Sequence, residues 1–146
     1  MKRIARSAIV EHSAQQMYAL VDDVESYPRF LPWCIDARVE SLDGKKRATL
    51  TAGLRGLRQS FTTLNENRPA EAIDMRLLEG PFRRFNAAWR FRALSAQACA
   101  IDFSLEYEFS SRALGKMLEP LFGEIADTMV DAFKRRADEV HGDDPR

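Results

Sequence analysis

Residues 99–109, CAIDFSLEYEF, decide the fold because their side chains alternate between apolar and polar. One face of this segment carries Cys99, Ile101, Phe103, Leu105, Tyr107 and Phe109, and the other carries Asp102, Ser104, Glu106 and Glu108. A period of two residues is that of a β-strand with one buried and one solvated face, which is typical of antiparallel sheets. The segment therefore predicts a strand that covers a hydrophobic core.

The preceding segment, residues 85–94, repeats this alternation and predicts the partner strand of a hairpin. Its expected inward side chains are Phe85, Ala87, Trp89 and Phe91, and its outward ones include Arg90 and Arg92. A short connection predicts three opposed pairs, which are Phe91 with Phe103, Trp89 with Leu105, and Arg92 with Asp102. The two arginines would then pair with the outward carboxylates of the second strand.

Upstream, five more strands and one helix are predicted. Strand patterns cover residues 4–10, 35–42, 47–52, 59–65 and 72–79, with turn signals at residues 43–44, 53–56, 68–69 and 80–81. Ser13 is placed as the N-cap of a helix whose apolar face includes Met17, Leu20, Val21 and Val24. The spacings favour an antiparallel meander that follows the first strand and its helix.

The last long segment, about residues 114–140, has the period of an amphipathic helix. Its apolar stripe consists of Leu114, Leu118, Leu121, Ile125, Met129, Phe133 and Val140. Pro120 is expected to kink this helix or to mark a restart. The order of elements predicts an α+β fold in which a curved antiparallel sheet of about seven strands wraps around the long C-terminal helix. One domain, residues 1–141, is expected, with a loose tail at residues 142–146.

The composition excludes several classes of function. Twenty-two basic and 22 acidic residues give a formal net charge of zero, so no overall attraction to DNA is expected. Only Cys34 and Cys99 are present, without metal-ligand spacing, so no metal, cofactor or disulfide scaffold is predicted. No signal peptide or long apolar run is visible, and a cytoplasmic protein, peripheral at the inner membrane at most, is expected.

Residues 24–34, VESYPRFLPWC, combine two prolines with a dense group of large apolar side chains. The prolines forbid a regular α-helix through the segment, which predicts a shaped corner. Tyr27, Phe30, Leu31 and Trp33 would either close one end of the core or line the mouth of a cavity. Cys34 is expected to be a small buried filler because no basic neighbour would activate its thiol.

Three segments carry a family resemblance, namely DDVESYPRFLPWC, EGPFRRFNAAWRF and IDFSLEYEF. With the order of elements, they resemble the coenzyme Q-binding proteins and their bacterial relatives, including the ribosome association toxin. These belong to the START-like (polyketide cyclase/dehydrase and lipid transport) superfamily. The resemblance covers about residues 3–141, and its specific parts are the pattern Tyr27-Pro28, Phe30, Pro32, Cys34 and the turn at residues 80–82.

The resemblance implies a helix-grip (START/Bet v 1-like) fold with a hydrophobic tunnel that binds ubiquinone or a similar prenylated lipid. The protein would then be a non-enzymatic carrier or chaperone that supports respiration. The expected ligand-binding residues are Tyr27, Phe30, Leu31, Trp33, Phe61, Met75, Phe82, Trp89, Phe91, Phe103, Tyr107, Met129 and Phe133. Tyr107 and Tyr18 could each donate a hydrogen bond to a quinone carbonyl, although a tyrosine satisfied within the core is the commoner case.

Two other functions stay open at this point. The resemblance to the toxin implies binding to the large ribosomal subunit and a block of subunit association. Ten basic residues could contribute to an RNA-binding patch, although scattered charge is the favoured interpretation: Lys45, Lys46, Arg47, Arg55, Arg58, Arg83, Arg84, Lys134, Arg135 and Arg136. A cyclase-like enzyme is the weaker alternative, because no catalytic residues can be assembled from the sequence.

The segment GLRGLR, residues 53–58, places two leucines among arginines and glycines. One interpretation packs Leu54 and Leu57 onto the end of the sheet and leaves the arginines in water. The alternative is a flexible loop at the mouth of the tunnel, in which the two leucines contact the membrane while ligand is exchanged.

Overall fold

A computed structural model describes residues 1–142, so most of the predicted tail, residues 142–146, lies outside the described residues. The elements in chain order are β1 (Lys2–Val10), α1 (Ala14–Asp22), the 3-10 helix η1 (Val24–Arg29), β2 (Cys34–Leu42), β3 (Lys45–Leu54), β4 (Leu57–Arg68), β5 (Ala72–Glu79), β6 (Phe82–Ser95), β7 (Ala98–Phe109), α2 (Arg112–Ala137) and the π-helix η2 (Asp138–Gly142).

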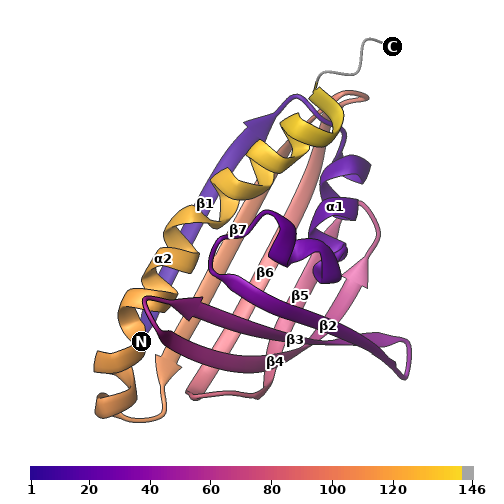
Figure 1. Ribbon diagram of the computed structural model, residues 1–146. Helices are drawn as coiled ribbons and strands as arrows, with labels where there is room; N and C mark the ends of the chain where they lie inside the picture. Colours follow the sequence, from indigo (N-terminus) through magenta and orange to yellow (C-terminus); the bar gives the residue numbers. More distant parts are fainter. Residues whose placement is uncertain (143–146) are drawn as a thin grey trace.

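The seven strands form one antiparallel sheet in the order β1-β7-β6-β5-β4-β3-β2. Figure 1 shows that this sheet curves around α2, while α1 and η1 close the remaining side. Side chains from the concave face of the sheet and from α2 bury one another and form the core. The predicted α+β fold, a curved sheet around a long C-terminal helix, is confirmed.

The alternation that predicts β6 and β7 is reproduced by their burial, but the predicted register is wrong by two residues. Trp89 lies opposite Phe103 rather than Leu105, and Phe91 lies opposite Ile101. The hairpin is tighter than expected and contains an irregularity between Ala93 and Ser95. A shift of two residues keeps every side chain on its predicted face, so the inward and outward assignments remain correct.

The first helix begins as its sequence predicts. The Ser13 hydroxyl accepts a hydrogen bond from the Gln16 backbone N–H, and the Gln16 side chain accepts one from the Ser13 N–H. This reciprocal pair is a capping box, and it satisfies two backbone donors that the helix end would otherwise leave free. The α-helix ends at Asp22, and the predicted member of its apolar face, Val24, is buried in η1 instead.

The segment with two prolines is a corner built on the 3-10 helix η1. The Leu31 N–H donates to the Tyr27 carbonyl at 2.9 Å, and the Cys34 N–H donates to the Leu31 carbonyl at 2.9 Å. These bonds turn the chain from η1 into β2. Tyr27, Leu31 and Trp33 are buried, whereas both prolines are exposed. The prolines therefore shape the corner from outside, and the large apolar side chains fill it from inside.

The long helix α2 runs through Pro120 without a break. Of the two predicted outcomes at this proline, a kink or a restart, the restart is wrong. Ser111 caps the helix by accepting a hydrogen bond from the Leu114 N–H at 3.2 Å. Val140, predicted to lie on the buried stripe, is 48% exposed because α2 ends at Ala137. The stripe is wider than predicted, since Phe122 is also buried.

Candidate functional site

The interior of the molecule contains a small cavity between the concave face of the sheet and α2. Its volume is about 50 Å³. Its lining consists of Tyr27, Trp33, Leu50, Phe61, Thr63, Met75, Phe85, Ala87, Trp89, Phe103, Leu105, Phe122, Ile125 and Met129. These side chains come from η1, the corner, five strands and one face of α2, so the cavity exists only in the folded chain.

The cavity wall is almost entirely apolar, and its few polar atoms are mostly occupied. The Thr63 hydroxyl donates to the Asn65 side-chain oxygen at 2.7 Å. The Tyr27 hydroxyl donates to the Val21 carbonyl, and burial raises the pKa of this phenol far above its ordinary value. The Trp33 Nε1 is buried and has no acceptor among the described residues. Such a wall favours a ligand held by apolar contact area rather than by hydrogen bonds.

Seven of the thirteen predicted ligand-binding residues line this cavity: Tyr27, Trp33, Phe61, Met75, Trp89, Phe103 and Met129. The other six, Phe30, Leu31, Phe82, Phe91, Tyr107 and Phe133, are not among its lining residues. Phe133 packs edge-on against Tyr27 and Trp89, with ring centroids 5.3 Å away in each case. Phe82 packs behind the cavity wall, 4.9 Å between ring centroids from Phe122 and 6.3 Å from Phe61, both of which line the cavity.

Of the two tyrosine hydroxyls considered as donors to a quinone carbonyl, that of Tyr107 already donates within the protein, whereas that of Tyr18 only accepts. The Tyr107 hydroxyl donates to Glu119 Oε1 at 3.0 Å, and the Tyr18 hydroxyl accepts from the Asn67 amide at 3.1 Å. Burial and the nearby Glu119 raise the pKa of Tyr107. Tyr107 is therefore occupied as a donor inside the core, while donation by Tyr18 to a quinone stays a prediction.

The predicted set of ligand-binding residues omitted half of the cavity lining: Leu50, Thr63, Phe85, Ala87, Leu105, Phe122 and Ile125. Alternation along the strands identified Phe85, Ala87 and Leu105 as inward, but it could not tell which inward residues leave space. Phe122 could have been found from its spacing, since it lies seven residues before Met129 on the same helix face. Thr63 gave no signal because it is one of several polar residues in β4, LRQSFTTLNENR.

The size of the cavity limits what it holds without a change of shape. Ligand pockets for small molecules usually measure about 300–1,000 Å³, and one water in the liquid takes about 30 Å³. At about 50 Å³ the interior is nearly filled. A lipid tail would therefore have to displace part of the wall, and the unbranched side chains of Met75 and Met129 are the most adaptable parts of it.

The cysteine of the corner is a buried filler, as its surroundings in the sequence predict. Cys34 is 5% exposed, and its thiol donates to the Asp36 carbonyl at 3.5 Å. Burial and the nearby carboxylate of Asp36 raise the pKa of the Cys34 thiol to about 11. The thiol is therefore protonated near neutral pH and is a poor nucleophile.

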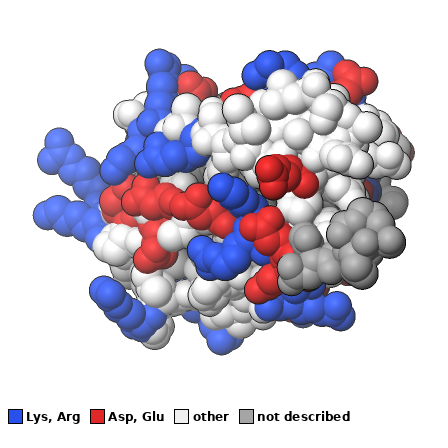
Figure 2. Space-filling model, turned by 90° about the horizontal axis from the view of Figure 1, so that it is seen from above, with Lys and Arg blue, Asp and Glu red and all other residues white. Residues whose placement is uncertain are grey.

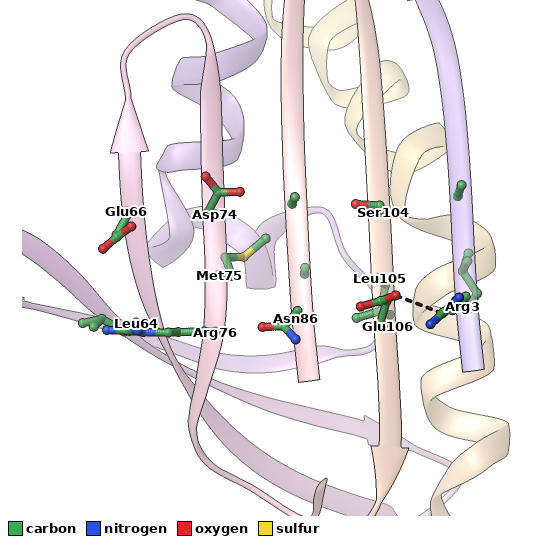
Figure 3. Close-up of a pocket in the computed structure, with 14 residues that line it drawn as sticks. Arg3, Leu64, Glu66, Asp74, Met75, Arg76, Asn86, Ser104, Leu105 and Glu106 are labelled. Carbon is green, nitrogen blue, oxygen red and sulfur yellow. Dashed lines mark ion pairs between the residues drawn. The ribbon is translucent and has the colours of Figure 1, made fainter. Parts of the chain in front are cut away.

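The outer face of the sheet carries a shallow trough of about 540 Å³, shown in Figure 3. Its lining combines small side chains, among them Ala5, Ala88 and Ser104, with charged ones. The predicted pairing of the β7 carboxylates with Arg90 and Arg92 is wrong. Figure 3 shows Glu106 paired with Arg3, whose Nε lies 2.9 Å from the carboxylate. Glu108 pairs with Arg83, and Arg90 pairs with Asp74 of β5. The register of the neighbouring strands explains this. β1 brings Arg3 to Glu106, β6 brings Arg83 to Glu108, and β5 brings Asp74 to Arg90.

The segment GLRGLR is the two-residue turn of the β3–β4 hairpin. β3 continues to Leu54 and β4 begins at Leu57, so only two residues connect the strands. Arg55 and Gly56 have φ values of 53° and 83°, as a two-residue type I′ turn requires. Leu54 and Leu57 pack partly against the core, and both arginines are exposed. Membrane contact by the two leucines remains a prediction.

The ten basic residues considered as an RNA-binding patch do not form one surface. Five of them are bound in ion pairs, namely Lys45, Lys46, Arg47, Arg83 and Arg136. Arg136 also lies over the ring of Phe30, 5.1 Å from its centroid. In Figure 2, basic and acidic side chains alternate over the face seen from above. The charges of this face are therefore mixed in sign.

Two features of the described residues bear on membrane and metal chemistry. Among residues 1–142, no helix is both long and apolar enough to cross a bilayer. Within the same part of the chain, no group of three or more His, Cys, Asp or Glu side chains is placed to hold a metal ion.

Solved structures with this architecture identify the class of fold. An aromatase/cyclase, Zhui, from Streptomyces superposes with a TM-score of 0.80 at 18% identity, covering 94% of this chain and 93% of that chain. An 18 kDa protein from Caulobacter crescentus superposes with a TM-score of 0.75 at 32% identity, covering 97% and 99% of the two chains. A START superfamily protein from Mycobacterium smegmatis gives 0.76 at 23% identity, covering 94% and 98%. The fold is the START-like helix-grip fold.

Sequence comparison then gives the family. The model of the polyketide cyclase/dehydrase and lipid transport family matches residues 10–134, and the chain belongs to this family. The ribosome association toxin RatA of Escherichia coli K12 is 42% identical over 97% of this chain and 90% of its own length. The mitochondrial coenzyme Q-binding protein COQ10 homolog B of Xenopus laevis is 30% identical over 97% of this chain and 61% of its own length. The expected resemblance is confirmed.

Proposed function

We propose that the protein is a non-enzymatic carrier that binds the apolar tail of a prenylated quinone, or of a similar lipid, between the sheet and α2. The observation that carries this proposal is the aromatic and aliphatic lining of the interior cavity, whose polar atoms are few and mostly engaged. Area removed from water contributes about 25 cal/mol per Å², so a prenyl tail in such a site would be strongly held. The similarity to a coenzyme Q-binding protein supports the same class of ligand.

Because the cavity is small, the proposal includes a change of shape on binding. Met129 is only half-buried on α2, and Met75 faces it from β5. Rotation of these two flexible side chains, together with a small displacement of α2, would open a path between helix and sheet. The ligand would then take the place of contacts that hold α2 in the closed molecule.

Extraction of the purified protein with an apolar solvent, followed by mass spectrometry, tests the proposal directly. A quinone or another lipid with a long tail is expected in the extract. Ala87→Val would add methyl groups to the cavity wall and is expected to lower the ligand content by more than about half. Ala88→Val is the matched control, because Ala88 follows Ala87 on the same strand but does not line the cavity. Equal ligand content in both variants, or none in the wild type, would refute the proposal.

A second candidate function is association with the large ribosomal subunit, as a regulator that blocks subunit joining. The 42% identity with a ribosome association toxin over almost the whole chain favours it. It would use the outer surface of the fold, so the two functions do not compete for the cavity. Sedimentation with ribosomal subunits in a sucrose gradient tests it. A shift of the protein onto large subunits that weakens with salt, without lipid in the extract, would make this the leading function.

A cyclase-like reaction receives less support than either binding function. The solved aromatase/cyclase is 18% identical, which demonstrates a common fold and nothing more. The cavity wall offers Thr63 and Tyr27, whose hydroxyls are already donated to protein acceptors. A carrier requires only a wall that excludes water, and that is what these side chains provide.

A further inference from the structure

One end of the molecule, where the β3–β4 turn meets the first turns of α2, combines apolar side chains with free cations. Figure 1 shows the β3–β4 turn lying against α2, and β3 and α2 are in contact. We define the basal surface by four apolar residues, Ile35, Leu54, Leu57 and Met117, and four basic ones, Arg55, Arg58, Arg112 and Lys116. The two groups come from β2, the hairpin and α2.

The apolar residues of the basal surface reach solvent although the core lies close by. Met117 is 52% exposed and Ile35 is 43% exposed. Ile35 leans over Gly53 so closely that any side chain at position 53 would collide with it. Leu54 and Leu57 are half-buried beside it. Large apolar side chains of this exposure, gathered at one end, point to an interaction surface.

The four basic residues of the basal surface have no carboxylate partner among the residues that the structure describes. The nearby acids are already paired, since Asp36 binds Arg38, Glu108 binds Arg83 and Glu119 binds Lys2. The basal surface is therefore positive although the whole chain is neutral. Such a local charge attracts an anionic surface over roughly a Debye length, about 8 Å at physiological salt.

We propose that the basal surface docks onto the face of an anionic lipid bilayer. Cations flanking apolar tips suit the headgroup region, where the charges meet lipid phosphates and the apolar side chains enter the acyl boundary. The basal surface contains no aromatic residue on which nucleic-acid bases could stack, so a single-stranded RNA is a poorer fit. The two-residue type I′ turn places Arg55 between the two leucines at the tip of the hairpin.

This inference rests on the proposed carrier function. It identifies the surface at which the carrier would exchange its lipid ligand with a membrane. Phe61, four residues along β4 from Leu57, lines the cavity. Phe122, five residues along α2 from Met117, also lines it, and the two ring centroids are 5.5 Å apart. Docking would therefore place the bilayer next to the seam between β4 and α2, where a tail could pass between membrane and cavity.

Co-sedimentation with vesicles tests the docking. The wild-type chain is expected to sediment with vesicles of phosphatidylcholine and phosphatidylglycerol in equal parts, and not with phosphatidylcholine alone. Arg58→Glu with Lys116→Glu is expected to weaken the binding more than about tenfold, because two attractive charges become repulsive. The matched control is Arg92→Glu with Lys134→Glu, which also reverses one cation on a strand and one on a helix. Both residues are exposed, lie outside the basal surface and have no carboxylate partner among the described residues. The control is expected to bind the vesicles within about twofold of wild type.

Salt separates the apolar contribution from the charge. In high salt the difference between the basal charge variant and wild type is expected to shrink. Met117→Asp is expected to weaken binding at both salt concentrations, while Val140→Asp, at a residue that is 48% exposed on η2, leaves it unchanged. Absence of binding to the anionic vesicles would overturn the proposal, and so would equal losses in the basal and control variants. Binding to RNA that the basal variant loses, without vesicle binding, would assign the surface to RNA instead.

The outcome can be separated from failure of the carrier function. Binding of a short-chain quinone in solution, followed by tryptophan fluorescence, requires the cavity but no membrane. If the basal charge variant keeps wild-type quinone binding and loses vesicle binding, both proposals stand. If every variant binds quinone and vesicles alike, the docking proposal fails alone. If wild type binds vesicles but no quinone, the carrier function fails, and the basal surface keeps only its membrane contact.

Discussion

The side chains on the inner and outer faces of the same sheet are held by different interactions. On the inner face, Trp89 and Phe103 lie in aromatic contact, with ring centroids 4.8 Å apart, and both are buried. On the outer face, Arg90 and Asp102 occupy the same pair of strands in water, and Arg90 pairs with Asp74 instead. Dispersion and the hydrophobic effect stabilise the buried aromatic contact, while solvent screening weakens the exposed ion pair. Stability is therefore expected to depend on the inner face and to tolerate change on the outer one.

The largest effect is expected from Phe133→Ala on α2. Phe133 is fully buried and contacts the rings of Tyr27, Phe30 and Trp89. Its loss leaves a void where helix, corner and sheet meet, so the free energy of unfolding is expected to fall by about 3–5 kcal/mol. Urea denaturation followed by circular dichroism measures this. A loss below about 1 kcal/mol would mean that α2 is not held by this aromatic contact.

The next effect is a loss of stability at alkaline pH. In the unfolded chain the Cys34 thiol ionises near its ordinary pKa of 9.0, whereas burial in the folded protein raises that pKa to about 11. Between these values only the unfolded state releases the proton, so the free energy of unfolding falls as pH rises, by roughly 2–3 kcal/mol in total. Below pH 9 this contribution is fully present.

Denaturation of wild type and Cys34→Ala across about pH 8 to 11 isolates the cysteine. The variant is expected to show a shallower alkaline decline than wild type, since it lacks the titrating thiol. Tyr27 and Tyr107, whose pKa values are also raised by burial, would still contribute in both proteins. Parallel declines in the two proteins would show that the Cys34 thiol is more hydrated than its burial indicates.

A smaller effect is expected from Tyr107→Phe, at the border between inner face and helix. The Tyr107 hydroxyl donates to Glu119, and Lys2 Nζ binds the same carboxylate oxygen at 2.7 Å. Removing the hydroxyl loses one hydrogen bond to a charged group but leaves the carboxylate its lysine and water. The expected loss is about 1–2 kcal/mol by thermal or urea denaturation. Tyr18→Phe, at a half-buried hydroxyl that only accepts from Asn67, is the milder comparison.

The smallest effect is expected on the outer face, from Arg90→Ala. The side chains of Arg90 and Asp74 are 46% and 45% exposed, so water screens their ion pair. The free energy of unfolding is expected to change by less than about 0.5 kcal/mol. A loss above about 1 kcal/mol in the same denaturation assay would show that the outer trough also stabilises the sheet, and it would break the contrast between the two faces.

Much of the fold follows from local patterns, and the errors lie where local patterns are degenerate. Alternation along residues 99–109 assigned the buried face of β7 correctly, but it cannot distinguish registers that differ by two residues. Ser13 identified the start of α1 because a capping box is a local device. The restart at Pro120 was wrong because packing against the sheet outweighs one missing hydrogen bond in a long helix.

The candidate site was harder to predict than the fold. The inward residues could be identified, yet seven of thirteen chosen side chains line the cavity and the others fill the core around it. Whether an inward aromatic ring leaves space depends on its neighbours across the sheet. Phe82, for example, stacks on Phe109 with ring centroids 5.1 Å apart and contacts Phe122 of the cavity wall, yet it does not line the cavity itself. Such distances are not encoded in spacing along the chain.

The sequence by itself determined the two faces of each strand, the capped first helix, the amphipathic last helix and the family. Each of these depends on a local periodicity or on a contiguous motif. The tertiary structure alone decided the register of β6 against β7, the partners of the outer charges, the small volume of the cavity and the gathering of Ile35, Leu57 and Met117 at one end. These features depend on distances between segments far apart in the chain, which only the packed sheet and helix fix.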